Sequence, residues 1–160
     1  MDTGTSLIAV ETILRVGLGL RILASGVSNV RRWPNPVKNA AFVFPFGATF
    51  FGAAAVFLMV AGGLGLALGL ATPVAASMIA LFLVPTLLIQ RHWLKTLPGM
   101  IGQVDRAIER DPERRTFQNI ARQAFHSHES GWQDNLLLLI LALFFALRGS
   151  AAFGLDNLLR

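Results

Sequence analysis

The chain has 160 residues, of which 54% are hydrophobic and 14% are charged, and it contains no cysteine. Soluble domains carry about 25% charged residues, so this composition falls outside their ordinary range. The lack of cysteine excludes disulfides, cysteine-ligated zinc, iron–sulfur clusters and thiol redox catalysis. The net charge of +5 does not indicate nucleic-acid binding, because half of the basic residues lie between Arg91 and Arg122, interspersed with acidic ones.

Four apolar segments are expected to cross a bilayer, at about residues 7–30, 44–70, 73–90 and 132–152. A hydrocarbon core about 30 Å thick needs about 20 apolar residues of helix, and helices satisfy their own backbone hydrogen bonds in lipid. The first segment has neither a basic leader nor a small-residue cleavage site, so we expect it to remain as an anchor. The sequence therefore predicts a single all-α domain over residues 1–160, an integral membrane four-helix bundle.

The polar stretch over residues 91–131 is too long for a plain connector between the third and fourth helices. Asp111 is a suitable N-cap, Pro112 suits a first helical turn, and apolar residues then recur at helical spacing. We predict an amphipathic interfacial helical insertion lying on the membrane surface. The alternative is a small soluble cap packed on the bundle. The apolar positions are Phe117, Ile120, Ala121, Ala124 and Phe125.

Basic residues predict the orientation. The loops at 28–43 and 91–134 carry three and seven basic residues, whereas the opposite side carries only Arg148 and Arg160 outside the spans. By the positive-inside rule, both loops are expected in the cytoplasm and both termini outside. All three tryptophans fall at the loop-side ends of the spans, where indole prefers the membrane interface, and are expected to act as anchors: Trp33, Trp93 and Trp132.

Small residues follow one another at four-residue spacing in the second segment, at Ala61, Gly65 and Gly69. Such a ridge lets helix backbones approach closely in lipid. We interpret it as an assembly signal, used either within the bundle or towards a partner.

The first segment contains charges that a membrane helix usually turns inward. Glu11 and Arg15 are four residues apart and share a helix face, which Ser25 and Asn29 continue, and Arg21 lies further along the segment. These five residues are a candidate intramembrane polar binding site. The alternative is structural, with Glu11 and Arg15 neutralising each other while Arg21 extends towards the headgroups.

Three histidines, His92, His126 and His128, form a candidate metal site at the loop-side interface. Residues two apart on a helix point in nearly opposite directions, so His126 and His128 could share an ion only if the helix ended there. The competing interpretation makes Ala124–Asn135 an interfacial hinge, with Ser130 or Asp134 capping the last helix.

Three stretches, in this order, resemble the DoxX family of small four-span membrane proteins. They are "LRVGLGLRILASGVSNV" in the first helix, "GGLGLALGLATPVAA" across the second helix and the turn into the third, and "DNLLLLILALFFALRGSAAFGLDNLL" in the last helix. Asn29 stands where the family often has a basic residue, and "FLMVAGG" lacks the glutamate that often precedes the second-helix glycines. The insertion is also longer than a typical family loop.

The resemblance implies association with membrane oxidoreductases. We expect a non-catalytic accessory subunit that binds a larger oxidoreductase complex in the bacterial inner membrane. The alternative is an oxidoreductase or quinone-binding protein acting in its own right. The expected partners are that complex and the lipid bilayer. We predict no cofactor in the chain itself, with quinone entering through the complex.

Overall fold

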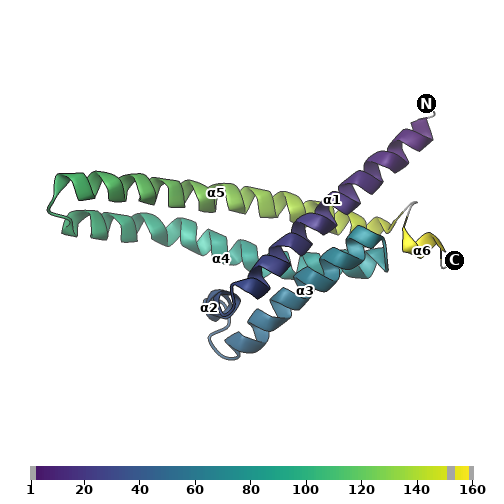
Figure 1. Ribbon diagram of the computed structural model, residues 1–160, viewed down its shortest axis with the longest axis horizontal. Coiled ribbons are helices and arrows are strands. Elements are labelled where there is room, and N and C mark those ends of the chain that lie inside the picture. Colours follow the sequence, from purple (N-terminus) through teal and green to yellow (C-terminus); the bar gives the residue numbers. More distant parts are fainter. Residues whose placement is uncertain (1–2, 151–153, 159–160) are drawn as a thin grey trace. The chain divides into compact units, whose positions relative to one another are not determined.

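The structure is a computed structural model that describes residues 3–150 and 154–158 (Figure 1). The end of the predicted fourth span, at residues 151–152, and Arg160 lie outside this part. The described residues are helical and contain no strand, which confirms the predicted all-α class. The helices are α1 (Thr3–Arg31), α2 (Asn35–Ala41), α3 (Ala48–Leu68), α4 (Thr72–Ala107), α5 (Asp111–Arg148) and α6 (Leu155–Leu158).

Three of these helices, α3, α4 and α5, are long and apolar enough to cross a membrane. The helix α1 is not among them, although its 29 residues exceed the roughly 20 that a span requires. It carries Glu11, Arg15 and Arg21 within its apolar stretch. The structure therefore supports a membrane protein with three clear spanning helices, and the predicted fourth span in α1 stays a prediction.

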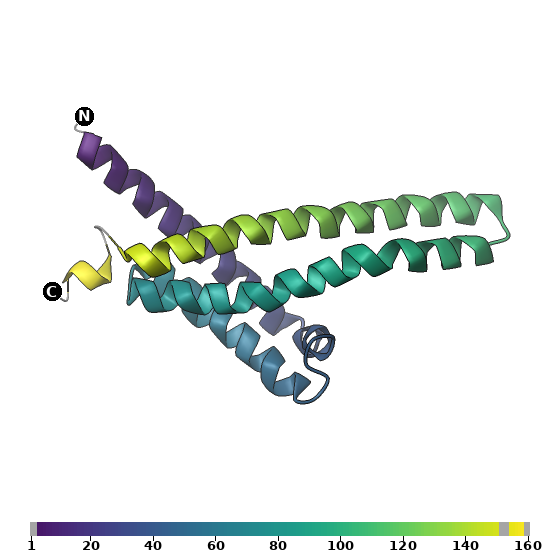
Figure 2. The same cartoon turned by 180° about the vertical axis from the view of Figure 1, so that it is seen from behind.

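The chain divides into two compact units, residues 1–85 with 138–160, and residues 86–137. In the first unit, α1 crosses α3, as both views show (Figures 1 and 2). Its core joins α1, α3, the first turns of α4 and the end of α5. The buried apolar residues include Leu18, Ile22, Met59, Leu66, Ala76, Ile79, Leu83, Ala142 and Phe145.

Glycine ends α3 and permits the tight reversal into α4. Gly69 has a φ of 66°, in the left-handed region that glycine adopts at little cost. Its N–H donates to Leu66 O and the N–H of Leu70 donates to Gly65 O, the two bonds of a Schellman ending. The next helix begins at Thr72 with Pro73 in its first turn, one residue from the start predicted by sequence.

The proline-containing linker forms the short helix α2. Helix α1 ends at Arg31, before Pro34, as expected for a residue that cannot continue a helix. Pro36 lies in the first turn of α2, where its missing N–H costs nothing, and is buried. Helix α2 packs on the start of α3, where a Cβ on Gly52 would lie 3.0 Å from the backbone of Val37.

The second unit is a hairpin made from the end of α4 and the start of α5, which run side by side in both views (Figures 1 and 2). The span limits near Gln90 and Trp132 stay predictions, but α4 and α5 continue as helices through both positions, with 36 and 38 residues. The predicted hinge at Ala124–Asn135 is therefore wrong. The fall in hydropathy there marks a change from apolar to polar side chains on the helix surface. The residues remain good enough helix formers to continue the helix.

Candidate functional site

The most buried charged residue of the described chain is Arg15, whose exposed fraction is 1%. Helical spacing places it on the inner face of α1 with Leu18 and Ile22. Its Nη1 donates to Leu66 O at 2.8 Å and to Ala67 O at 3.3 Å. These are among the last carbonyls of α3, which carry partial negative charge, and Leu66 O also accepts the N–H of Gly69. Arg15 therefore caps the end of α3 from a neighbouring helix.

The start of α4 is capped by a negatively charged side chain from α6. The two carboxylate oxygens of Asp156 accept hydrogen bonds from the N–H groups of Ala71, at 2.6 Å, and Thr72, at 2.9 Å. The N–H of Asp156 in turn donates to Gly69 O at 2.9 Å. A carboxylate at a helix N-terminus satisfies free donors and complements the positive end of the helix dipole.

A third pair joins α1 to the end of α5. Arg148 Nε lies 3.2 Å from Glu11 Oε2, and the Glu11 side chain is only 11% exposed. Glu11 lies one turn before Arg15 on the same side of α1. We call Glu11, Arg15, Arg148 and Asp156 the charged clamp, because their contacts join the first half of α1 to the ends of α3 and α5, and join α6 to the start of α4.

One buried polar atom at the clamp lacks a hydrogen-bond partner. The side chain of Thr72 is fully buried, and its Oγ1 is unpaired within the part of the chain that the structure describes. A buried hydroxyl without a partner is unfavourable, because it has lost its bonds to water. Thr72 thus lies at the Asp156 carboxylate, which its own N–H binds, while its side-chain hydroxyl has one donor and two lone pairs unused.

The five residues of the predicted polar cluster divide into three groups. Glu11 and Arg15 belong to the charged clamp. Arg21 is exposed and donates through Nη1 to Ser25 Oγ at 2.7 Å. The amide of Asn29 faces α3, with Nδ2 3.4 Å from Met59 Sδ. The structure does not gather them into one pocket.

Sequence reasoning missed Asp156, Arg148 and Thr72. An acidic residue just after a long apolar span is a weak signal, yet the turn before Pro73 exposes N–H groups that need an acceptor. The acceptor lies 84 to 85 residues away along the chain, which no local pattern reveals.

Part of this arrangement lies in a region that matches a protein family. The DoxX family model matches residues 10–92, just over half of the chain, and thus includes Glu11, Arg15, α3 and the turn into α4. The chain belongs to the DoxX family. Neither the curated proteins nor the solved structures contain a match.

The closest helix contact in this DoxX protein involves other glycines than the predicted ridge. A Cβ on Gly63 would lie 2.6 Å from Leu23 N, and one on Gly19 would lie 2.5 Å from Ala67 N, so α1 and α3 meet at these two residues. Gly65 of the predicted ridge faces α4, where a Cβ would lie 3.0 Å from that of Ala75. Gly69 lies at the clamp, and Ala61 is partly buried.

The hairpin, which lies mostly beyond the DoxX match, holds the histidines and two of the tryptophans. His128 stacks on Trp93 with ring centroids 6.1 Å apart, and His126 Nδ1 lies 3.4 Å from Glu129 on the exposed side. His92 packs edge-on against Trp93. Among the described residues, no three histidine, aspartate or glutamate side chains are grouped closely enough to hold a metal ion. Trp33 is half exposed before α2, and Trp132 is partly buried in α5.

Polar pairs hold the two helices of this hairpin in register. Asn135 Nδ2 donates to Gln90 Oε1 at 3.0 Å, close to Gly131, where a Cβ would lie 2.9 Å from Gln90 Nε2. Ser130, a predicted cap, instead donates to His126 O within α5, and Asp134, the other candidate, also lies inside that continuous helix. A buried or half-buried amide pair favours one alignment of two helices over others.

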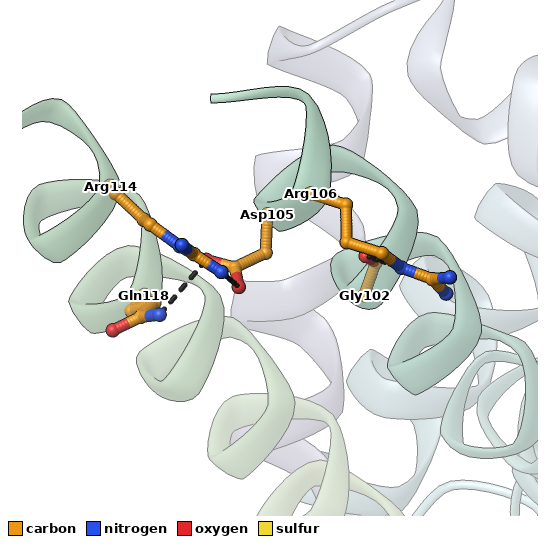
Figure 3. Close-up of polar contacts among 5 residues, drawn as sticks. All are labelled: Gly102, Asp105, Arg106, Arg114 and Gln118. Atoms are coloured by element: carbon orange, nitrogen blue, oxygen red, sulfur yellow. Dashed lines mark hydrogen bonds and ion pairs between the residues drawn. The ribbon is translucent and has the colours of Figure 1, made fainter. Parts of the chain in front are cut away.

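Near the tip of the hairpin, Asp105 accepts two hydrogen bonds from Arg114, at 2.8 and 3.2 Å, and one from Gln118 at 2.9 Å (Figure 3). Arg106, its neighbour, instead donates to Gly102 O in its own helix. Asp105 lies in the polar part of α4, fifteen residues past the predicted span end at Gln90. The hydrogen bond from Arg114 is the main cause of a pKa for Asp105 below its ordinary value, with Gln118 adding to it.

We expect Asp105 to stabilise the hairpin at neutral pH. Because its folded-state pKa is lowered, the contribution is present above the ordinary aspartate value of about 3.9 and is lost as the pH falls through the lowered pKa. In Asp105→Asn, backbone hydrogen exchange around Asp105 and Arg114 should be severalfold faster than in the wild type at pH 7. The difference should disappear in strong acid. Glu113→Gln is the matched control. It also removes a carboxylate that pairs with an arginine, but the pair between Glu113 and Arg110 is exposed and longer, at 3.5 Å. Equal exchange in both variants would contradict the prediction.

Proposed function

We propose that this DoxX protein is an integral membrane accessory subunit that binds and stabilises a larger membrane oxidoreductase complex in the bacterial inner membrane. In this proposal α1 is a fourth span, completing a four-helix bundle with α3, α4 and α5. The loops at 28–43 and 91–134 are cytoplasmic and both termini lie outside. The polar residues 91–131 then belong to the cytoplasmic side, where the hairpin is available to the complex.

The observation that carries the proposal is how the charges of the family-matched region are used. Arg15 is committed to the carbonyls of Leu66 and Ala67, and Glu11 lies against Arg148. Charges in membrane helices usually mark ligand or ion pathways, and these are instead used to hold helix ends together. A rigid bundle with its intramembrane charges engaged in this way suits a subunit that supports another protein.

The proposal is tested on membranes that contain the untagged chain at its natural level. After extraction in a mild detergent, native mass spectrometry should recover the chain in a complex with a larger membrane protein. Deleting the chain should lower the abundance and activity of that partner, and re-expression should restore both. Recovery only as a free monomer or homo-oligomer, with no enzyme affected by the deletion, would overturn the proposal.

The unpaired Thr72 hydroxyl supports a second candidate, a quinone-binding protein acting in its own right. A buried hydroxyl with its hydrogen unused is the type of donor that a quinone carbonyl accepts from. If this candidate holds, the purified chain alone should retain quinone through extraction, and Thr72→Val should lose it. Metal analysis and an optical spectrum of the same sample test the histidine site. A colourless, metal-free and quinone-free chain would exclude this function.

A further inference from the structure

The outer face of α1 carries a charge with no acidic contact. This face comprises Gly17, Arg21, Ala24 and Ser28, at spacings of four, three and four residues, and is turned away from the buried Arg15, Leu18, Ile22 and Gly26. Within the described chain, the hydrogen-bond partner of the Arg21 guanidinium is Ser25 Oγ at 2.7 Å, and no carboxylate contacts it. The flanking residues Leu20 and Val27 are apolar and exposed, at 54% and 37%.

The position of Arg21 makes contact with lipid unfavourable. In the proposed topology Arg21 lies nine residues before the end of the span at Val30, roughly 13 Å along the helix. The bond to Ser25 keeps the guanidinium at about the level of Ser25. Along the helix axis the charge is therefore displaced from the Arg21 Cα by only about one turn, 5.4 Å. The charge therefore stays in the hydrocarbon region, where exposed cations are costly and need a partner.

The chemistry of the face indicates what covers it. A guanidinium in an apolar environment is best satisfied by a carboxylate, with which it can form two parallel hydrogen bonds. Gly17 leaves room for a close approach, because a Cβ there would have nothing within 4 Å, and small residues allow helix backbones to pack closely in membranes. A second copy of this chain does not fit, since symmetric pairing through this face would place Arg21 against its own equivalent.

We propose that the outer face of α1 docks against a transmembrane helix of the partner protein, and that this helix carries an aspartate or glutamate at the depth of Arg21. The inference rests on the proposed accessory function and names the surface through which it operates. It also accounts for the less apolar character of α1, because one of its charges is satisfied only in the complex.

The experiment compares partner recovery, by native mass spectrometry of mild-detergent extracts, for Arg21→Leu and Gly17→Leu. Both variants should lower recovery by about tenfold or more, while the thermal unfolding temperature of the isolated chain stays unchanged or rises for Arg21→Leu. Arg32→Leu and Gly4→Leu are the matched controls, since they make the same changes at exposed positions outside this face. Both controls should retain the partner.

The outcomes separate the two proposals. Normal partner recovery with both Arg21→Leu and Gly17→Leu would overturn the docking surface and leave the accessory function intact, with Arg21 then facing lipid or headgroups. Absence of any partner in the wild type would overturn the accessory function itself. If the partner helix is identified, reversing its carboxylate to arginine should restore recovery with Arg21→Glu, and failure of that rescue would count against the assigned pairing.

Discussion

Replacing Arg15 by methionine is expected to lower the free energy of unfolding in detergent by about 2–3 kcal/mol, the range for a buried hydrogen bond made by a charged group. Methionine keeps most of the volume but removes the guanidinium hydrogen bonds to Leu66 O and Ala67 O, of which Leu66 O keeps only the N–H of Gly69. The removal also leaves the nearby Asp156 and Glu11 carboxylates with less compensating charge. Thermal unfolding of the purified chain, followed by tryptophan fluorescence, measures the effect.

Two further variants test whether the stability depends on the charge and shape of the Arg15 side chain, or only on the presence of a buried polar group. Arg15→Lys keeps the charge but lacks the planar fork, so it should recover only part of the stability. Thr72→Val removes a buried polar atom at the same site that has no partner among the described residues, and should leave stability unchanged or raise it. An Arg15→Met variant as stable as Thr72→Val would show that the clamp contributes little.

Replacing Gly63 by alanine is expected to force α1 and α3 apart. The added Cβ would lie 2.6 Å from Leu23 N and 2.9 Å from Gly19 O, and backbone atoms in the middle of a helix cannot move aside independently. Overpacking of this kind costs about 1–3 kcal/mol, which should outweigh the gain of up to about 1 kcal/mol in helix propensity. The unfolding temperature measured in the same detergent should fall.

The control for this prediction is Gly17→Ala, in the partner helix of the same contact. Gly17 faces open space, so alanine there gains helix propensity without a clash and should stabilise the isolated chain slightly. Gly19→Ala should behave like Gly63→Ala, because a Cβ on Gly19 would lie 2.5 Å from Ala67 N. If all three variants unfold at the same temperature, the contact between α1 and α3 is looser than described.

The sequence predicted the helical class and the turn at Pro73 because both depend on local chemistry. Long uncharged runs favour helices in lipid, and a glycine followed by proline favours a reversal. The helices continue through Gln90 and Trp132 because hydropathy reports where a helix leaves an apolar environment, whereas the helix itself ends only where its backbone bonds end.

The clamp and the glycine contact were beyond local patterns for different reasons. The place of Arg15 in an apolar segment indicates an inward-facing charge, but the acceptors at Leu66 and Ala67 are main-chain carbonyls, which every residue has. In α3, glycines at 62, 63 and 65 offer several small-residue ridges, and only the positions of α1 and α4 decide which of them is used. Asp156 combines both difficulties, because it is distant along the chain and its hydrogen bonds with Gly69, Ala71 and Thr72 are to backbone groups.

The place of Asp156 in the chain also has a consequence for biosynthesis. Arg15 can reach its carbonyl acceptors as soon as α3 has been made, 51 to 52 residues later, whereas the first turn of α4 receives its carboxylate only after residue 156 leaves the ribosome. Helix α1 is also the least suited of the long helices to enter a bilayer alone. Membrane insertion of this protein is therefore expected to depend on cooperation between early and late segments, with α1 settling beside α3 and the last residues completing the assembly.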